Sequence, residues 1–153
     1  MATEEIRMDD KITVKSIAPW DTGARRLASI GDIHIIPYGT VLLTREEVIA
    51  QAQNGNKLLT GTDGEGSHAT WYIDDEWTRK EVGFDKQVRL TKEEISRICG
   101  LKTQSTFESN IKKVAVTRAE KAMLMDCLEK LKINDYSKIR FCEKYTRIKF
   151  NGK

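Results

Sequence analysis

The chain has 153 residues, 39% of them hydrophobic and 32% charged, and a formal net charge of +3 at pH 7. This length suits one ordinary domain or two small lobes, and the composition is that of a folded soluble protein rather than a disordered segment. No apolar run approaches the roughly 18 residues that span a bilayer, and the acidic start MATEEIRMDD lacks the basic and apolar parts of a secretory signal. The sequence therefore predicts a protein that is made in the cytoplasm and has no membrane partner.

The first half of the chain predicts mainly β-strands. In KITVKSI, residues 11–17, apolar and polar side chains alternate with the period of a half-buried strand. DIHIIPYGTVLLT predicts a hairpin in which residues 33–36 pair with residues 40–43 around Pro37-Tyr38-Gly39. Two further short strands are expected at NKLLT and ATWYI, residues 56–60 and 69–73.

Helices are predicted from their capping residues. Thr44 and Glu47 have the spacing of a capping box, at the head of a helix that should end at Asn54-Gly55. DDEWTRKEV, residues 74–82, predicts a short helix. In the second half the same signature recurs at Thr91 with Glu94, Ser105 with Glu108, and Thr117 with Glu120.

The second half predicts a small helical bundle. After Thr117, an apolar stripe at i, i+3, i+4 and i+7 is formed by Leu124, Cys127, Leu128 and Leu131. A last helix is expected to begin near Asn134.

Charge is distributed unevenly between the two halves. Residues 1–85 have 9 lysines and arginines against 15 aspartates and glutamates, a net charge of −6, whereas residues 86–153 have 17 against 8, a net charge of +9. We therefore predict an α+β protein with an acidic, β-rich lobe at residues 1–85 that contains one or two short helices. A basic helical bundle with a helix-turn-helix-like pair is predicted at residues 86–153. Such opposed charges indicate two different partners, or copies that meet front to back.

The stretch TGTDGEGSHATWYID, residues 60–74, has the composition of a chemical site. However, a phosphate-binding loop needs a lysine and a following helix, and a calcium loop needs a closing glutamate. Ser67 and His68 are sequence neighbours, whose side chains would point to opposite faces of a strand. We interpret the stretch as a connection between strands, with a turn at Asp63-Gly64 and close approach of another backbone at Gly66.

No catalytic, cofactor-binding or metal-binding residue is predicted elsewhere, and the chain is not expected to be an enzyme. Asp21 could pair with His34 or His68, but no nucleophile or metal-ligand spacing accompanies these histidines. The cysteines are too widely spaced for a zinc ribbon or a disulfide framework, and we expect Cys99, Cys127 and Cys142 to be free and buried.

The segment LTKEEISRICGLKTQSTFESNIKK, residues 90–113, has the pattern of a helix-turn-helix, with Gly100 at the turn. It resembles the half-motif of arabinose-regulator-type transcription factors. Ser96 stands where alanine usually lets the helices approach, and the second helix has few arginines for phosphate contacts. A DNA-binding regulator is the alternative function that this segment predicts, and the expected nucleic-acid contacts are Lys102, Gln104, Lys112 and Lys113.

A larger part of the chain resembles a different family. Residues 17–84 contain PWD from Pro19, GDI from Gly31, a capped helix that ends in QNGN, and GTDGEGSHA before a strand. In these motifs they resemble structural proteins of tailed bacteriophages, especially the crAss-like group that infects gut bacteria. The basic helical tail, from FESNIKK through INDYSKIRF, is similar to the tail of the same proteins.

This resemblance implies a non-enzymatic virion protein without a cofactor, either an auxiliary protein on the capsid shell or a ring component (connector) at the head-to-tail junction. The implied partners are the major capsid protein or other virion proteins, with self-association in the particle and potential DNA contact through the basic lobe. The implied location is the virion, after synthesis in the cytoplasm of the host bacterium. The residues expected to contact partners are Trp20, Arg25, Arg26, Asp63, Glu65 and His68.

Overall fold

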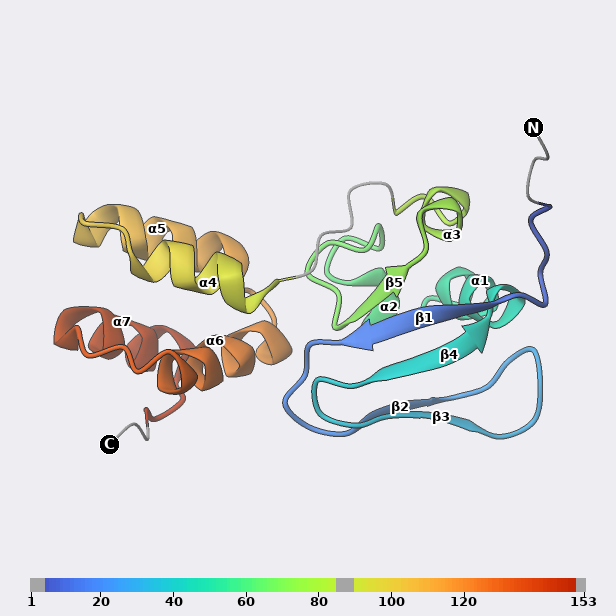
Figure 1. Ribbon diagram of the computed structural model, residues 1–153, viewed down its shortest axis with the longest axis horizontal. Coiled ribbons are helices and arrows are strands. Elements are labelled where there is room, and N and C mark those ends of the chain that lie inside the picture. Colours follow the sequence, from blue (N-terminus) through green and yellow to red (C-terminus); the bar gives the residue numbers. More distant parts are fainter. Residues whose placement is uncertain (1–4, 85–89, 151–153) are drawn as a thin grey trace. The chain divides into compact units, whose positions relative to one another are not determined.

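The computed structural model describes residues 5–84 and 90–150, which form two compact units (Figure 1). The first unit contains the described residues 5–16 and 20–84, and the second contains residues 17–19 and 90–150. The predicted α+β class is confirmed, because strands and short helices are followed by a helical unit. The boundary predicted between residues 85 and 86 lies outside the described residues.

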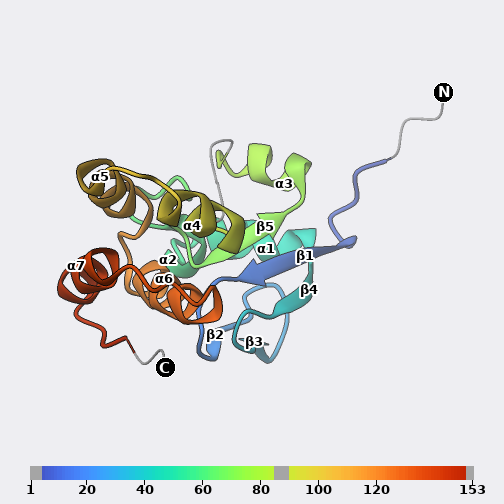
Figure 2. The ribbon, with the colours of Figure 1, turned by 60° about the vertical axis from the view of Figure 1, so that its left-hand side comes forward.

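The first unit is built on two small antiparallel sheets. One has the strand order β4-β1-β5, formed by β4 (Thr40–Thr44), β1 (Lys11–Ser16) and β5 (Trp71–Asp74). The other pairs β2 (Thr22–Arg25) with β3 (Asp32–Ile35) and lies beside β4 (Figures 1 and 2). The alternation predicted for the first strand is confirmed, since every second residue of β1 from Ile12 is buried.

The hairpin predicted from residues 33–36 and 40–43 is wrong. The chain does reverse between them, where the Gly39 N–H donates to the Ile36 carbonyl at 2.8 Å. Yet β3 pairs with β2, and β4 pairs with β1. Strand β2 was not predicted, because TGAR has no alternating apolar pattern, and its partner is therefore visible only in the fold.

The described residues of the first unit form three helices: α1 (Arg45–Gln53), α2 (Lys57–Thr60) and α3 (Glu76–Glu81). The helices predicted after Thr44 and within residues 74–82 correspond to α1 and α3. The strand predicted at residues 56–60 is wrong, because these residues form α2. Asn56 explains the difference, since its Oδ1 accepts from the Leu58 N–H at 3.0 Å and caps a helical turn.

A buried arginine ties three parts of the first unit together. Arg45, at the start of α1, is only 5% exposed. Its Nη1 donates to the Arg7 carbonyl at 2.7 Å and lies 3.1 Å from Asp10 Oδ2, and its Nη2 lies 3.3 Å from Asp75 Oδ2. The guanidinium also lies over the ring of Trp77, 5.4 Å from its centroid. These contacts hold residues 7–10 and the start of α3 against α1.

Asp75 is expected to make the stability of the protein depend on pH. Burial acts to raise the pKa of this carboxyl, but hydrogen bonds from Thr78 and the charge of Arg45 hold the pKa below its ordinary value of 3.8. A group with a lowered folded-state pKa stabilises the fold above its unfolded-state pKa, and this contribution is lost as pH falls through the folded-state value. Asp75→Asn should therefore lower the free energy of unfolding at neutral pH, and the deficit should shrink below about pH 4. Urea unfolding of both proteins at pH 7 and pH 3 tests this, and a deficit of the same size at both pH values would contradict it.

The second unit consists of α4 (Lys92–Cys99), α5 (Gln104–Val114), α6 (Arg118–Lys130) and α7 (Tyr136–Thr146), as predicted (Figure 2). Within it α4 packs on α5 and α6, and α7 packs on α5 and α6. The core of this unit is one apolar cluster that also includes Ile17 and Ala18.

The caps of these helices are mostly those expected. The Thr117 and Glu120 capping box is present in both directions, and Thr91 accepts from the Glu94 N–H at 3.2 Å. The cap predicted at Ser105 is wrong, because α5 begins one residue earlier and its N-cap, Thr103, makes no side-chain capping bond.

Candidate protein-contact surface

The β2–β3 loop, residues 26–31, presents apolar side chains to solvent. Ile30 is fully exposed, with a relative accessibility of 101%, and Leu27 is 45% exposed. The loop is closed at its base, where the Arg26 N–H donates to the Gly31 carbonyl at 2.9 Å. An isoleucine held in this way projects from the surface without a covering side chain.

Glu47 of α1 fixes the conformation of this loop. Its carboxylate accepts from the Leu27 N–H at 2.9 and 3.1 Å and from the Ala28 N–H at 3.1 Å. Gln51, one turn further along α1, donates to Glu47 at 3.1 Å and to the Arg25 carbonyl at 2.7 Å. Both side chains are buried, with 1% and 3% exposure. The loop is therefore ordered before any partner binds, which lowers the entropy lost on association.

Only one half of the capping box predicted for Thr44 and Glu47 forms. Thr44 does accept from the Glu47 N–H, at 3.2 Å, as expected. The Glu47 carboxylate, however, bonds to the β2–β3 loop. The sequence pattern shows the spacing of a cap but not the loop that competes for the carboxylate.

Glu47→Gln is expected to loosen the β2–β3 loop. The amide replaces one acceptor oxygen with an N–H₂ group that faces the Leu27 and Ala28 N–H groups, so we expect the free energy of unfolding to fall by about 2 kcal/mol. Hydrogen exchange should become faster at those two amides. Glu46→Gln, which makes the same charge change at the exposed neighbouring position, is the control and should change the free energy of unfolding by less than about 0.5 kcal/mol. Unchanged hydrogen exchange at the Leu27 and Ala28 amides of the Glu47→Gln variant would contradict the role of Glu47 in holding the loop.

Other exposed apolar side chains are concentrated in the same unit. They lie on the N-terminal segment, at the ends of the two-stranded sheet and on the outer face of β4. The more exposed of them are Ile6 at 40%, Met8 at 43%, Ile36 at 59% and Leu42 at 60%. Single exposed apolar residues are common on protein surfaces, so these residues extend the candidate surface only where they adjoin the β2–β3 loop.

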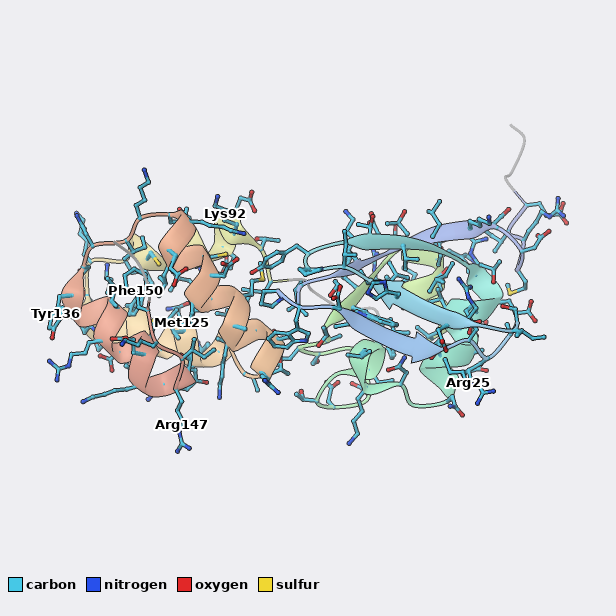
Figure 3. The ribbon with its side chains drawn as sticks, turned by 90° about the horizontal axis from the view of Figure 1, so that it is seen from below. Arg25, Lys92, Met125, Tyr136, Arg147 and Phe150 are labelled. Atoms are coloured by element: carbon cyan, nitrogen blue, oxygen red, sulfur yellow. The ribbon has the colours of Figure 1, made fainter. Side chains whose placement is uncertain are left out.

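Two of the predicted contact residues lie beside Ile30, and a third does not. Arg25 is the last residue of β2 and lies at the edge of the first unit (Figure 3), and Arg26 begins the β2–β3 loop. Trp20, 36% exposed, precedes the opposite end of β2. There the Trp71 Nε1–H donates to Thr22 Oγ1 at 2.8 Å, which joins β5 to β2.

The glycine-rich loop between α2 and β5 is held by its own residues. Asp63 accepts from the Glu65 N–H at 2.7 Å, the Ser67 N–H at 3.2 Å and the Ser67 hydroxyl at 2.6 Å. The Ser67 hydroxyl bond, followed by the Glu65 backbone bond, lowers the pKa of Asp63 from its ordinary value of 3.8. Asp63 therefore organises the loop, and its carboxylate is largely occupied.

A close backbone approach of the kind predicted at Gly66 is found at Gly61. A Cβ at Gly61 would lie 1.9 Å from the Ser67 carbonyl oxygen. The Gly66 N–H donates to the Thr60 carbonyl at 2.7 Å, and the predicted turn glycine, Gly64, has φ 78°. The remaining contact candidates of this loop are Glu65, which is exposed, and His68, which is half-buried with φ 58°.

No protein-family model, no curated protein and no solved structure matches this chain. Among the described residues, no helix combines the length and the hydropathy needed to cross a bilayer. In residues 5–84 and 90–150, no group of three or more histidine, cysteine or acidic side chains is placed to hold a metal ion.

One of the two histidine pairs considered from the sequence forms. His34 Nε2 lies 3.1 Å from Asp21 Oδ1, with both side chains more than half exposed. A pair of this kind on an open strand surface is a surface contact between β3 and the residue before β2.

The cysteines are free and buried, as predicted. Burial raises the pKa of Cys99 to about 11 and that of Cys142 to about 12, and it also raises the pKa of Cys127. These thiols therefore stay protonated at neutral pH and act as apolar core groups.

The predicted nucleic-acid contacts on the helix pair are only partly available. Lys102, Lys112 and Lys113 are exposed. The Gln104 amide donates to Glu108 Oε2 at 3.0 Å and to the Ser137 carbonyl of α7 at 3.4 Å, so it is occupied within the unit. Lys138 of α7, 9% exposed, donates to the Cys99 and Leu101 carbonyls at 2.6 and 2.8 Å and holds the turn between α4 and α5.

Sequence reasoning missed Leu27, Ile30 and the clamp formed by Glu47 and Gln51. An apolar residue is usually expected to be buried, and Ile30 stands between a serine and a glycine in a segment without strand or helix periodicity. An isoleucine in a segment without such periodicity is the signal in the sequence that could have indicated an exposed apolar residue. Only the fold shows that the isoleucine faces solvent.

Proposed function

We propose that this chain is a non-enzymatic structural protein of a tailed-phage virion, an auxiliary protein that binds the capsid shell in many copies. A ring component at the head-to-tail junction is the related form of this proposal. The observation that carries it is Ile30, a fully exposed isoleucine on a loop that buried Glu47 holds in place. The motifs in residues 17–84 that resemble those of phage structural proteins agree with it.

The β2–β3 loop has the composition of a protein-binding anchor. Burial of an isoleucine against a partner contributes about 1.5–3 kcal/mol, and Leu27 adds apolar area beside it. Arg25 and Arg26 lie at the base of the loop, where arginines commonly rim an apolar contact. Self-association of neighbouring copies on the particle, which this proposal includes, would link such modest contacts and strengthen attachment.

The charge of the first lobe restricts its partner. Residues 1–85 have a net charge of −6, so the partner surface that surrounds the anchor should be neutral or basic. The basic helical lobe is then directed to a different surface of the particle, either acidic shell protein or packaged DNA.

The proposal is tested by sedimentation with virions. Purified chain, fluorescently labelled, is added to purified particles in increasing amounts and the bound fraction is measured in the pellet. A structural protein should bind to saturation, at a constant ratio to the major capsid protein. Non-saturating or absent binding to complete and to chain-depleted particles would contradict the proposal.

A DNA-binding regulator remains the second candidate, because α4 and α5 form consecutive helices with Lys102, Lys112 and Lys113 exposed. The bonds of Gln104 to Glu108 and Ser137 count against base reading by that side chain. Selection from a random pool of duplexes distinguishes the two functions, since a regulator should enrich one sequence.

A further inference from the structure

A groove in the helical unit is lined mainly by cations. It has a volume of about 380 Å³ and lies between the start of α6 and the end of α7. Its lining residues, which we call the basic groove, are Arg118, Lys121, Thr146, Arg147 and Ile148. Arg118 is the first residue of α6, and Lys121 follows it by almost one turn. Arg147 comes directly after α7 and extends away from the unit (Figure 3).

The cations continue beyond the groove along the side of α7. The Lys121 ammonium lies 4.9 Å from the ring centroid of Tyr145, which stacks on Phe141 at 5.8 Å. The Lys112 ammonium lies 5.9 Å from the centroid of Phe141. Tyr145 is fixed by its hydroxyl, which donates to the Ala115 carbonyl at 2.8 Å. Two aromatic rings thus hold the lysines in one row from the groove to the end of α5.

Two cations of this row are not engaged in salt bridges. In the described part of the chain, Lys121 and Arg147 form no ion pair, whereas Lys130 and Arg97 pair with Asp126 and Glu94 elsewhere in the unit. Two acids that are close to Lys121 and Arg147 in the sequence accept backbone hydrogen bonds: Glu120 accepts from the Val116 and Thr117 N–H groups, and Glu143 accepts from the Phe150 N–H. Lys121 and Arg147 therefore offer positive charges that no carboxylate pairs with in the described residues.

We propose that the basic groove and Lys112 bind the phosphate backbone of nucleic acid without reading its sequence. A row of cations matches a polymer with regularly repeated negative charge, and duplex DNA has one charge per about 1.7 Å of its axis. The row consists of cationic donors beside partly buried rings, and such donors contact phosphate oxygens whatever the base sequence, so we expect its contacts to position a backbone. This site differs from the predicted recognition face of α5, with which it shares only Lys112.

The test uses fluorescence anisotropy with a labelled 30-base-pair duplex of random sequence, titrated with the full chain at 50 to 200 mM salt. The groove variant carries Arg118→Gln, Lys121→Gln and Arg147→Asn; asparagine is chosen because Arg147 has φ 61°. The control variant carries Lys92→Gln, Lys130→Gln and Lys132→Asn. It removes the same charge from the same unit, and Lys132 also follows its helix with a positive φ of 55°. Lys92 and Arg147 lie on opposite sides of the helical unit in Figure 3.

We expect the wild-type chain to bind the duplex with an affinity that falls steeply as salt rises. The groove variant should bind at least tenfold more weakly at 100 mM salt, and the slope of log affinity against log salt should decrease by about 2 to 3, or about 0.9 per lost contact. The control variant should keep its affinity within about threefold. With a single-stranded probe that binds the same row, the slope of log affinity against log salt should decrease by about 0.7 per lost contact.

Three results would overturn the proposal. One is no duplex binding by the wild-type chain at 50 mM salt; another is an equal loss in the groove and control variants. The third is a wild-type chain that does not bind the duplex but self-associates through the groove residues, as measured by sedimentation velocity. The occupant of the basic groove would then be the acidic lobe of a second copy. If the groove variant unfolds below the assay temperature, Arg147→Asn alone is compared with Lys132→Asn.

Discussion

Replacing Ile30 with glutamate is expected to prevent the chain from binding to virions while leaving its fold intact. Ile30 is fully exposed and makes no core contact, so the free energy of unfolding should change by less than about 0.5 kcal/mol. In the complex, however, glutamate would have to lose its hydration in an apolar contact. We expect binding in the virion sedimentation assay to weaken by about 100-fold or more.

Tyr136→Glu is the matched control for this experiment. Tyr136 is a 69% exposed aromatic residue at the start of α7, so the substitution places a carboxylate on an exposed site in the other unit. It should leave binding within about threefold of wild type. Ile36→Glu, at the other end of β3, then maps how far the contact extends. Equal binding by Ile30→Glu and wild type would show that the β2–β3 loop is not the anchor.

Gly61→Ala is expected to cause the largest loss of stability among single substitutions in the first unit's loops. Its Cβ would lie 1.9 Å from the Ser67 carbonyl oxygen, and the backbone has φ 71°. The loop can relieve this overlap only by breaking the bond from the Thr62 N–H to the Ser67 carbonyl, which measures 2.9 Å. We expect the free energy of unfolding, measured by urea denaturation, to fall by about 3 kcal/mol or more.

Gly64→Ala separates backbone strain from steric overlap. Gly64 has a similar φ of 78°, but a Cβ there would meet nothing within 4 Å. Gly64→Ala should therefore lower the free energy of unfolding only by the cost of placing alanine in the left-handed backbone region, about 1 kcal/mol. Similar losses in the two variants would mean that the backbone contact between Gly61 and Ser67 is not needed.

Elements with local signals were predictable from the sequence. Strand β1 has strict alternation, and α1, α4 and α6 begin at threonines whose caps form. The pairing of β3 with β2 was not predictable, because it depends on a partner, TGAR, whose own residues show no strand period. The helix α2 was missed because the Asn56 cap outweighs the apolar run that follows it.

The candidate surfaces depend even more on the fold. Arg25 and Arg26 could be proposed from the sequence, but only the structure places them beside an exposed Ile30. Glu47 has the spacing of a cap, and nothing local shows that the β2–β3 loop takes its carboxylate. In the same way, the basic groove joins Arg118 and Lys121 of α6 to Arg147 after α7, residues that are far apart along the chain.

The two proposed surfaces are compatible with one structural protein. The apolar β2–β3 loop lies on the acidic unit, and the basic groove lies on the helical unit. A shell protein and a phosphate backbone could thus be bound by different units of one chain. The duplex assay and the virion assay test these surfaces independently, so that failure of one leaves the other standing.

The proposed function is tested most directly by quantitative mass spectrometry of virions purified from bacterial cells that produce this chain. Particles are separated on a density gradient, and peptides of the chain and of the major capsid protein are measured in every fraction. We predict that the chain peaks with the particles and keeps a constant ratio to the capsid protein across the peak. Its absence from the particle fractions, or a ratio that varies across them, would contradict a structural role in the virion.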